Sequence, residues 1–245
     1  MSRVVILIYG GLCYLLFLVV FLYAIGFVGD FIVPKSLDTD TPGHESQAAL
    51  MDVLLLGLFV VPHSVMARQG FKAWWTRIVP QAAERSTYVL VSSLLLALLM
   101  WQWRPLPSFV WEVVHPAARF PLYAVFWTGW VIVLWSTFLI DHFDLCGLRQ
   151  VYLHARRRSS EPMRFRTPAL YRFVRHPLML GFLLAFWATP RMTVGHLLFA
   201  AATTAYILVA VRLEERDLLA LHGEAYRDYQ RRVGMMVPVG VFKRR

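Results

Sequence analysis

The feature that most constrains this chain is a series of long apolar segments, each close to the length that crosses a bilayer. A helix needs about 20 mostly apolar residues to span the hydrocarbon core of a membrane. The sequence holds six such candidates, namely Val4–Val28, Ala48–Met66, Thr87–Trp103, Pro121–Ile140, Pro177–Thr189 and Thr193–Val211. They predict an all-α fold class, a polytopic helical bundle in a membrane.

The fifth candidate is shorter than a full span, and only Pro190–Arg191–Met192 separates it from the sixth. The two together predict a tight helical hairpin near the C-terminus. Five full spans plus a half-span, or six full spans, both remain open. The first segment is too long for the core of a signal peptide and has no small-residue cleavage site before Asp30, so we expect it to be retained.

Composition supports a membrane protein. Of the 245 residues, 58% are hydrophobic and 16% are charged, whereas a soluble domain has about half apolar and about a quarter charged residues. The net charge of +10 does not indicate nucleic-acid binding, because the basic residues lie in particular gaps between apolar segments and not on one face. Cys13 and Cys146 stand far apart and form neither a metal-ligand spacing nor a disulfide framework, so we expect no metal.

The distribution of Lys and Arg predicts the orientation of the chain in the membrane. The successive gaps between apolar segments, followed by the C-terminal tail, hold 1, 4, 2, 8, 1 and 8 of these residues. Loops rich in Lys and Arg stay on the cytoplasmic side. We therefore expect a multi-pass protein of the bacterial inner membrane with both termini cytoplasmic, in contact with anionic lipids through runs such as Arg156–Arg158.

We expect one membrane domain over residues 1–245. Residues 1–141 are predicted to form transmembrane helices 1–4, and residues 142–245 a cytoplasmic loop, the helical hairpin and a C-terminal segment. Three clusters of ionisable residues lie at predicted membrane boundaries. Polar groups are costly to desolvate there, so each cluster needs a partner or a function.

The first cluster is Arg175–His176–Pro177, followed by Gly181. Proline suits the first turn of a helix, so His176 is expected at the cap of the fifth span. The free amides of a helix start beside two basic side chains would suit a carboxylate or a phosphate. Gly181, one turn further on, leaves room for a ligand or a neighbouring helix. The alternative is a cytoplasmic anchor followed by an ordinary helix start.

The second cluster ends the sixth span with Arg212, Glu214, Glu215 and Arg216. Arg212 can pair with Glu215, or Arg216 with neighbouring acids, at helical spacing. Adjacent glutamates on a helix point about 100° apart, so Glu214 and Glu215 cannot share one role. One can face a ligand while an arginine holds the other. A solvated, salt-bridged helix end is the alternative.

The third cluster is Asp141–His142–Phe143–Asp144, at the cytoplasmic end of the fourth span. A carboxylate close to the ring would favour the charged form of the histidine. If the ring stays neutral instead, it can accept a proton near pH 7, and a neighbouring carboxylate can orient it. A capped helix end with satisfied side chains is the alternative. His63, which follows Pro62 in the second span, is either a satisfied interior histidine or part of a polar pocket.

Taken in order, these motifs resemble the isoprenylcysteine carboxyl methyltransferase-like superfamily of membrane enzymes. The resemblance covers the pattern R-H-P-x-x-x-G, a short hydrophobic hairpin, R-x-E-E-R-x-L-x4-G-x-x-Y-x-x-Y and a final proline, over Tyr171 to Pro238. The chain departs from the pattern at Met179, where the superfamily often has tyrosine. Further similarity over Pro62–Arg68 and Ser136–Gln150 points to the branch of bacterial methanethiol S-methyltransferases, with the NnrU-like proteins as a related branch.

This resemblance implies S-adenosylmethionine as cofactor and methyl transfer to the sulfur of methanethiol, giving dimethyl sulfide. It assigns the following residues to the cofactor: Tyr171, Arg175, His176, Pro177, Leu178, Gly181, Arg212, Glu214 and Glu215. A base would help because a thiolate is a far better nucleophile than a thiol. The candidate catalytic residues are His142 with Asp141 or Asp144, and then His63.

Three alternatives remain open at this stage. A non-enzymatic NnrU-like protein would bind no cofactor, and a reductase would bind a nicotinamide cofactor. A third alternative keeps the methyl transfer but changes the acceptor to a prenylcysteine, a lipid amine or a larger thiol. The sequence does not set the oligomeric state.

Overall fold

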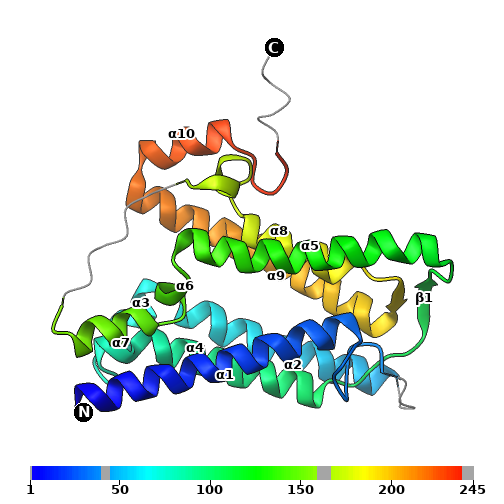
Figure 1. Cartoon of the computed structure of the whole chain (residues 1–245), viewed down its shortest axis with the longest axis horizontal. Helices are drawn as coiled ribbons and strands as arrows, with labels where there is room; N and C mark the ends of the chain where they lie inside the picture. Colours follow the sequence, from blue (N-terminus) through cyan, green and yellow to red (C-terminus); the bar gives the residue numbers. More distant parts are fainter. Residues whose placement is uncertain (1, 40–44, 159–166, 239–245) are drawn as a thin grey trace. The chain divides into compact units, whose positions relative to one another are not determined.

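The computed structural model describes residues 2–39, 45–158 and 167–238, and almost all of its regular structure is helical (Figure 1). The elements in chain order are α1 (Arg3–Gly29), α2 (Glu45–Met66), α3 (Gln69–Trp75), α4 (Gln81–Gln102), β1 (Phe109–Glu112), α5 (Pro116–Ile140), α6 (His142–Leu145), α7 (Leu148–Ala155), the 3-10 helix η1 (Ala169–Arg172), α8 (Pro177–Trp187), β2 (Arg191–Thr193), α9 (Val194–His222) and α10 (Glu224–Arg232).

The chain forms two compact units that interleave along the sequence. The first unit contains Met1–Trp111, Asp141–Pro162 and Arg191–Leu198, and the second contains Glu112–Ile140, Met163–Pro190 and Phe199–Arg245. Helix α9 therefore begins in the first unit and continues in the second. The prediction of one membrane domain, with its division after residue 141, stays a prediction.

Within the described residues, five helices are long and apolar enough to cross a membrane: α1, Ser46–Met66 of α2, α4, α5 and α9. Helix α8 is apolar but shorter. Only 22–33% of each apolar stretch is buried inside the protein, so side chains such as Leu12, Val19 and Leu22 face outward. Apolar surface of this extent needs lipid around it. The predicted all-α polytopic fold is confirmed, in the form of five long helices and one short one.

Several helices extend beyond the predicted apolar segments. Helix α4 begins at Gln81, before the predicted Thr87, and α5 begins at Pro116, before the predicted Pro121. Helix α9 continues to His222, well past the predicted Val211. Hydropathy marks only the apolar part of a helix, whereas polar residues with good helix propensity carry it further.

A short strand follows α8, at the position where the sequence predicted a simple turn. Strand β2 pairs with β1 in a two-stranded sheet. Arg191 in β2 places its guanidinium over the ring of Phe109 in β1, 4.8 Å from the ring centroid. The pairing joins segments that are about 80 residues apart in the sequence, and no local pattern announces such a contact.

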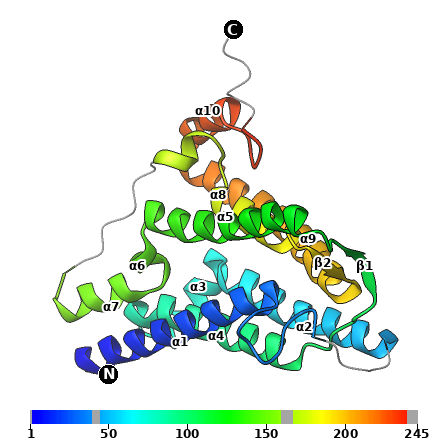
Figure 2. The same cartoon turned by 45° about the vertical axis from the view of Figure 1, so that its right-hand side comes forward.

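In the first unit, α1 runs beside α4 and packs against α7 (Figures 1 and 2). A Cβ atom on Gly10 of α1 would come within 2.6 Å of Val151 in α7. Gly147, just before α7, has a positive φ of 82° and lies so close to Ser86 in α4 that a Cβ atom would meet the Ser86 nitrogen at 2.6 Å. Glycine at both positions therefore permits the close approach of these helices.

In the second unit, α5 and α8 lie side by side (Figures 1 and 2). A Cβ atom on Gly129 of α5 would meet the Gly181 carbonyl oxygen at 2.6 Å, and one on Gly181 would meet the Gly129 oxygen at 2.7 Å. Helix α9 contributes Ile207 and Val211 to a core cluster with Met236. This packing holds the beginning of α8 and the end of the described chain in one core.

Candidate functional site

Two distant segments of the second unit meet at the start of α8. Val174 and Gly234 form a parallel bridge. The Arg175 amide donates to the Gly234 carbonyl at 2.9 Å, and the His176 amide donates to the Met235 carbonyl at 3.1 Å. These backbone bonds fix where the Arg175 and His176 side chains begin.

The Arg175 side chain joins three segments of the second unit. Its Nε donates to Glu215 Oε1 of α9 at 2.7 Å. Its Nη1 donates to the Val233 carbonyl at 2.5 Å and to the Gln230 carbonyl at 3.2 Å, both at the end of α10. Only 11% of the Arg175 side chain is exposed. The hydrogen bonds of the guanidinium are therefore made largely to groups of the protein itself.

Glu215 uses both carboxylate oxygens within the same cluster. Its Oε1 accepts from Arg175 and lies 3.2 Å from His176 Nε2, while its Oε2 accepts from Gln230 Nε2 at 3.1 Å. The Glu214 side chain is 50% exposed, with Oε2 at 3.6 Å from His176 Nδ1. The two glutamates thus have separate environments, as their angular spacing predicted.

The partner of Glu215 differs from the one at helical spacing. Glu215 pairs with Arg175, 40 residues away in sequence, whereas Arg212 is exposed on α9. Of the partners that the sequence left open for Glu215, the observed one comes from another segment, which the parallel bridge at Val174 holds beside Gly234. We define the donor cluster as Arg175, His176, Glu214 and Glu215 together with Gln230.

Helix α8 begins as predicted, with His176 at the cap and Pro177 in the first turn. The His176 side chain makes no capping hydrogen bond at the helix start. The amides of Leu178 and Met179 therefore belong to the unsatisfied first turn, and they carry the positive end of the helix dipole. Such a helix start, beside the basic groups of the donor cluster, fits a carboxylate.

The other residues assigned to the cofactor have diverse environments. Pro177 and Gly181 are buried, Tyr171 and Leu178 are partly buried, and Arg212 is exposed. Of the two uses left open for Gly181, the close contact with α5 is the one observed. The Tyr171 carbonyl accepts from the Tyr229 hydroxyl at 2.5 Å. Burial raises the pKa of Tyr229 to about 12, so this hydroxyl keeps its proton at neutral pH.

The third cluster lies in the first unit. Asp141 caps α6 by accepting from the Asp144 amide at 3.0 Å, and its Oδ2 pairs with Arg149 Nη1 at 2.5 Å. Asp144 accepts from Gln150 Nε2 at 3.1 Å. These contacts give both carboxylates structural partners, in agreement with the capped helix end left open above.

His142 has a different partner from the two carboxylates. It is buried, and its Nε2 lies 3.0 Å from the hydroxyl of Tyr14 in α1. Burial lowers the pKa of His142, and the nearby charge of Asp141 opposes that shift in part. A lowered pKa leaves the ring neutral at pH 7, which is the state that a base requires.

His63 lies in α2 and is surrounded by partners of the first unit. Its ring stacks on Phe59, with ring centroids 5.2 Å apart. Its Nδ1 lies 3.0 Å from Ser92 Oγ, and its Nε2 lies 3.1 Å from the Tyr88 hydroxyl. Both ring nitrogens are engaged, which agrees with a satisfied interior histidine. Its role as a second candidate base stays a prediction.

Sequence reasoning missed a buried network in the first unit. Asp38 Oδ2 lies 2.8 Å from His196 Nδ1, and Asp38 Oδ1 accepts from Thr193 Oγ1 at 2.6 Å. All three side chains are fully or almost fully buried. The available signal was Thr193 three residues before His196, which predicts a side-chain cap at the start of α9; the Thr193 hydroxyl does accept from the His196 amide at 3.1 Å.

The chain is similar to named proteins over most of its length. It is 58% identical to the methanethiol S-methyltransferase of Mycobacterium tuberculosis, over 97% of this chain and 98% of that protein. It is 54% identical to the methanethiol S-methyltransferase of Crocosphaera subtropica, over 97% of this chain and 93% of that protein. A more distant relative is Nurim of Rattus norvegicus, 33% identical over 73% of this chain and 71% of that protein.

No family model matches the chain, and no solved structure matches it significantly.

Proposed function

The chain belongs to the methanethiol S-methyltransferase family, and from this premise we propose that it transfers a methyl group from S-adenosylmethionine to the sulfur of methanethiol. Membership makes the chain a methyltransferase that acts on methanethiol. The observation that carries this is the 58% identity over nearly all of both chains. The non-enzymatic and reductase alternatives lose their support, whereas the donor and the site residues remain proposals.

The proposed reaction forms one bond and breaks one bond at a single carbon. The sulfur of methanethiol bonds to the methyl carbon while the bond from that carbon to the sulfonium sulfur breaks. Dimethyl sulfide and S-adenosylhomocysteine are the products, and the thiol proton passes to a base. S-adenosylmethionine, when bound, supplies the electrophilic methyl carbon, so the protein's task is to align the reactants and exclude water.

The donor cluster supports a site for S-adenosylmethionine in the second unit. The uncapped start of α8 suits the carboxylate of an amino-acid group. Glu214 is half exposed and supplies a carboxylate for an ammonium group or a hydroxyl group. Arg175 and Glu215 hold each other and Gln230, so we assign them to positioning the site and not to direct contact with the ligand.

Base catalysis is assigned to His142 in the first unit. Its lowered pKa keeps the ring neutral, and Asp141, Asp144 and their partners hold α6 in place around it. A neutral imidazole that gains a proton from a thiol becomes an imidazolium, and the thiol becomes the thiolate that attacks. His63 is retained as the second candidate.

A binding and turnover experiment tests this function directly. Detergent-purified protein is expected to bind S-adenosylhomocysteine but not NADPH in calorimetry. With S-adenosylmethionine supplied, it is expected to convert methanethiol to dimethyl sulfide, measured in the headspace by gas chromatography. A prenylcysteine, a phospholipid amine and a larger thiol serve as competing acceptors. If any of these is methylated faster than methanethiol, that compound is the methyl acceptor instead. Binding of NADPH without binding of S-adenosylhomocysteine would refute S-adenosylmethionine as the methyl donor.

The orientation in the membrane is a second proposal. The long apolar helices make this a multi-pass membrane protein, and the Lys and Arg distribution supports an orientation with both termini in the cytoplasm of a bacterium. Reporter fusions after Arg158 and at Arg245 are expected to report the cytoplasm, and a fusion near Thr41 the opposite side. A periplasmic signal at Arg245 would contradict this orientation.

A further inference from the structure

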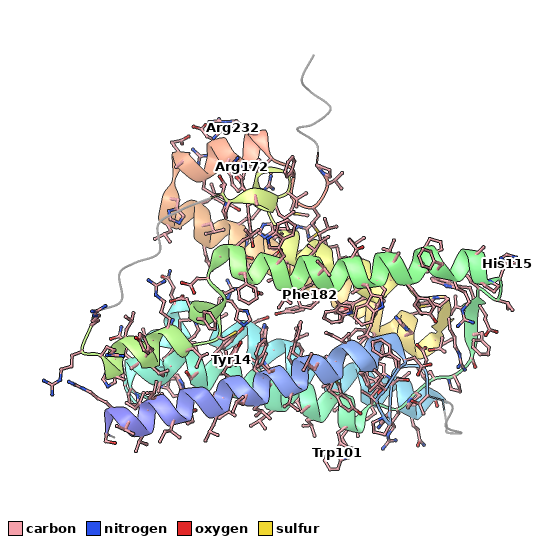
Figure 3. All side chains as sticks on the ribbon, viewed as in Figure 1. Tyr14, Trp101, His115, Arg172, Phe182 and Arg232 are labelled. Atoms are coloured by element: carbon pink, nitrogen blue, oxygen red, sulfur yellow. The ribbon has the colours of Figure 1, made fainter. Side chains whose placement is uncertain are left out.

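Tyr14 is the residue of α1 that contacts His142. Its hydroxyl lies 3.0 Å from His142 Nε2, and the two rings meet edge to face with centroids 5.7 Å apart. Tyr14 is labelled in Figure 3. The two residues are 128 positions apart in the sequence, and neither the apolar pattern of α1 nor the third cluster predicted the contact.

Tyr14 is more accessible than His142. The exposed fraction of His142 is 4%, but Tyr14 is only partly buried. The rings of Phe17 and Phe143 lie near the Tyr14 ring, with centroids at 6.2 Å and 6.4 Å. These aromatic neighbours provide an apolar setting that suits a methyl-bearing thiol arriving through lipid.

The groups around His142 Nε2 allow this nitrogen to accept a hydrogen bond. Cys146 Sγ lies 4.0 Å from the same nitrogen. Burial raises the pKa of Cys146 to about 11, so its thiol keeps its proton at neutral pH. Asp141, the carboxylate whose charge acts on His142, is paired with Arg149. Two neutral groups that each carry a proton therefore face Nε2, which favours the neutral ring with its lone pair directed at Tyr14.

We propose that Tyr14 relays the proton of the acceptor thiol to His142. The inference rests on the proposed function with His142 as base. The S–H bond of methanethiol breaks as its proton bonds to the Tyr14 oxygen, and the original Tyr14 proton bonds to His142 Nε2. The products of the step are a thiolate, a neutral Tyr14 and an imidazolium, so atoms and charge balance. A base within reach through one hydroxyl satisfies the usual geometric requirement.

Helix α1 offers a matched control for this role. The Tyr9 hydroxyl lies 2.9 Å from Thr87 Oγ1 of α4, so Tyr9 has the same side chain on the same helix with a hydroxyl partner of its own. Tyr9→Phe and Tyr14→Phe each remove one such hydroxyl and keep the ring. Loss of general packing or stability should therefore affect both variants, whereas loss of a relay affects only Tyr14→Phe.

The experiment compares methyl transfer in Tyr14→Phe, His142→Ala, the double variant and Tyr9→Phe, with S-adenosylhomocysteine affinity and thermal unfolding measured for each. Tyr14→Phe is expected to slow methyl transfer by about 10²-fold near pH 7, the lower end of general-base effects, at unchanged ligand affinity. The deficit should shrink as pH rises, because bulk water then supplies thiolate. The double variant should be no slower than His142→Ala alone, because both residues serve one proton path.

Three results would overturn the relay: a wild-type rate in Tyr14→Phe, a deficit that is the same at every pH, or losses that multiply in the double variant. Wild-type protein provides a measurement that does not depend on variants. Its chemical step in mixtures of H2O and D2O should slow non-linearly with deuterium content, since two protons move, and a linear decrease would also overturn the relay. Wild-type protein without methyl transfer would instead refute the proposed function.

Discussion

The His142→Ala variant is expected to methylate methanethiol about 10²- to 10⁴-fold more slowly than the wild-type protein near pH 7, the range that general-base catalysis usually contributes. The ring is neutral and buried in the wild-type protein, so its removal leaves water as the proton acceptor. Affinity for S-adenosylhomocysteine should stay near wild type, because the donor cluster lies on other elements. Single-turnover methyl transfer measured beside calorimetry separates the two effects.

The pH dependence provides a stricter test of His142. Burial lowers the pKa of this histidine, so the neutral form persists to a lower pH than in an ordinary histidine. The wild-type rate should therefore hold down to mildly acidic pH and fall only as pH drops through the lowered pKa. The variant rate should instead rise with pH as the free thiol ionises. The ratio of the two rates narrows toward high pH.

His63→Ala is the comparison for the second candidate. Its ring nitrogens already have partners in Ser92 and Tyr88, so we expect a change in stability and little change in the pH profile. If His63→Ala shows a pH-dependent loss of methyl-transfer rate and His142→Ala keeps the wild-type rate, His63 is the base and His142 is not. Equal fractional loss at every pH in His142→Ala would make His142 a supporting residue of the site.

The Glu215→Ala variant is expected to lose both stability and ligand affinity. Removal of this carboxylate takes the charged acceptor from Arg175, which has 11% of its side chain exposed, and the acceptor of the Gln230 side chain. Breaking such an ion pair on one side typically costs about 3–5 kcal/mol when the pair is buried, and the exposed part of Glu215 puts the expected cost at the lower end. Affinity for S-adenosylhomocysteine should fall about ten- to a hundredfold, because the segments that form the donor cluster separate.

Glu214→Ala is the matched control on the neighbouring position. Half of the Glu214 side chain is exposed, and it lies 3.6 Å from His176. We expect a loss of ligand affinity with a thermal unfolding temperature near wild type. Equal destabilisation in the two variants would contradict the separate roles assigned to the glutamates. Unchanged affinity for S-adenosylhomocysteine in both variants would favour the alternative that the two glutamates belong to a salt-bridged helix end without a ligand.

Some features of this structure follow directly from the sequence because they are local. A span needs only a continuous apolar run, so the five long helices in the described part of the chain were recognisable. The separation of Glu214 from Glu215 follows from helix geometry, and the start of α8 follows from proline chemistry. These properties involve neighbours along the chain, and neighbours are what a single sequence displays.

Other features depend on residues that are distant in the sequence. Glu215 has an arginine one turn away, yet it pairs with Arg175, because a parallel bridge to Gly234 brings that segment in. Arg175 also donates to the Val233 carbonyl, and backbone carbonyls carry no sequence signal. In the sequence, Tyr14 is one of several aromatic residues in an apolar helix. Its contact with His142 of α6 is visible only in the folded structure.

The Asp38 network has a consequence for the order in which the protein is assembled. Asp38 and its partner His196 are 158 residues apart in the chain. A ribosome adding about 5–20 residues per second needs roughly 8–30 s to make that stretch. During this interval the Asp38 carboxylate cannot form these two hydrogen bonds, since Thr193 and His196 have not yet been made. The segment after α1 that contains Asp38 can therefore form these hydrogen bonds only late in biosynthesis, when the start of α9 has been made, although α1 is the first helix to be synthesised.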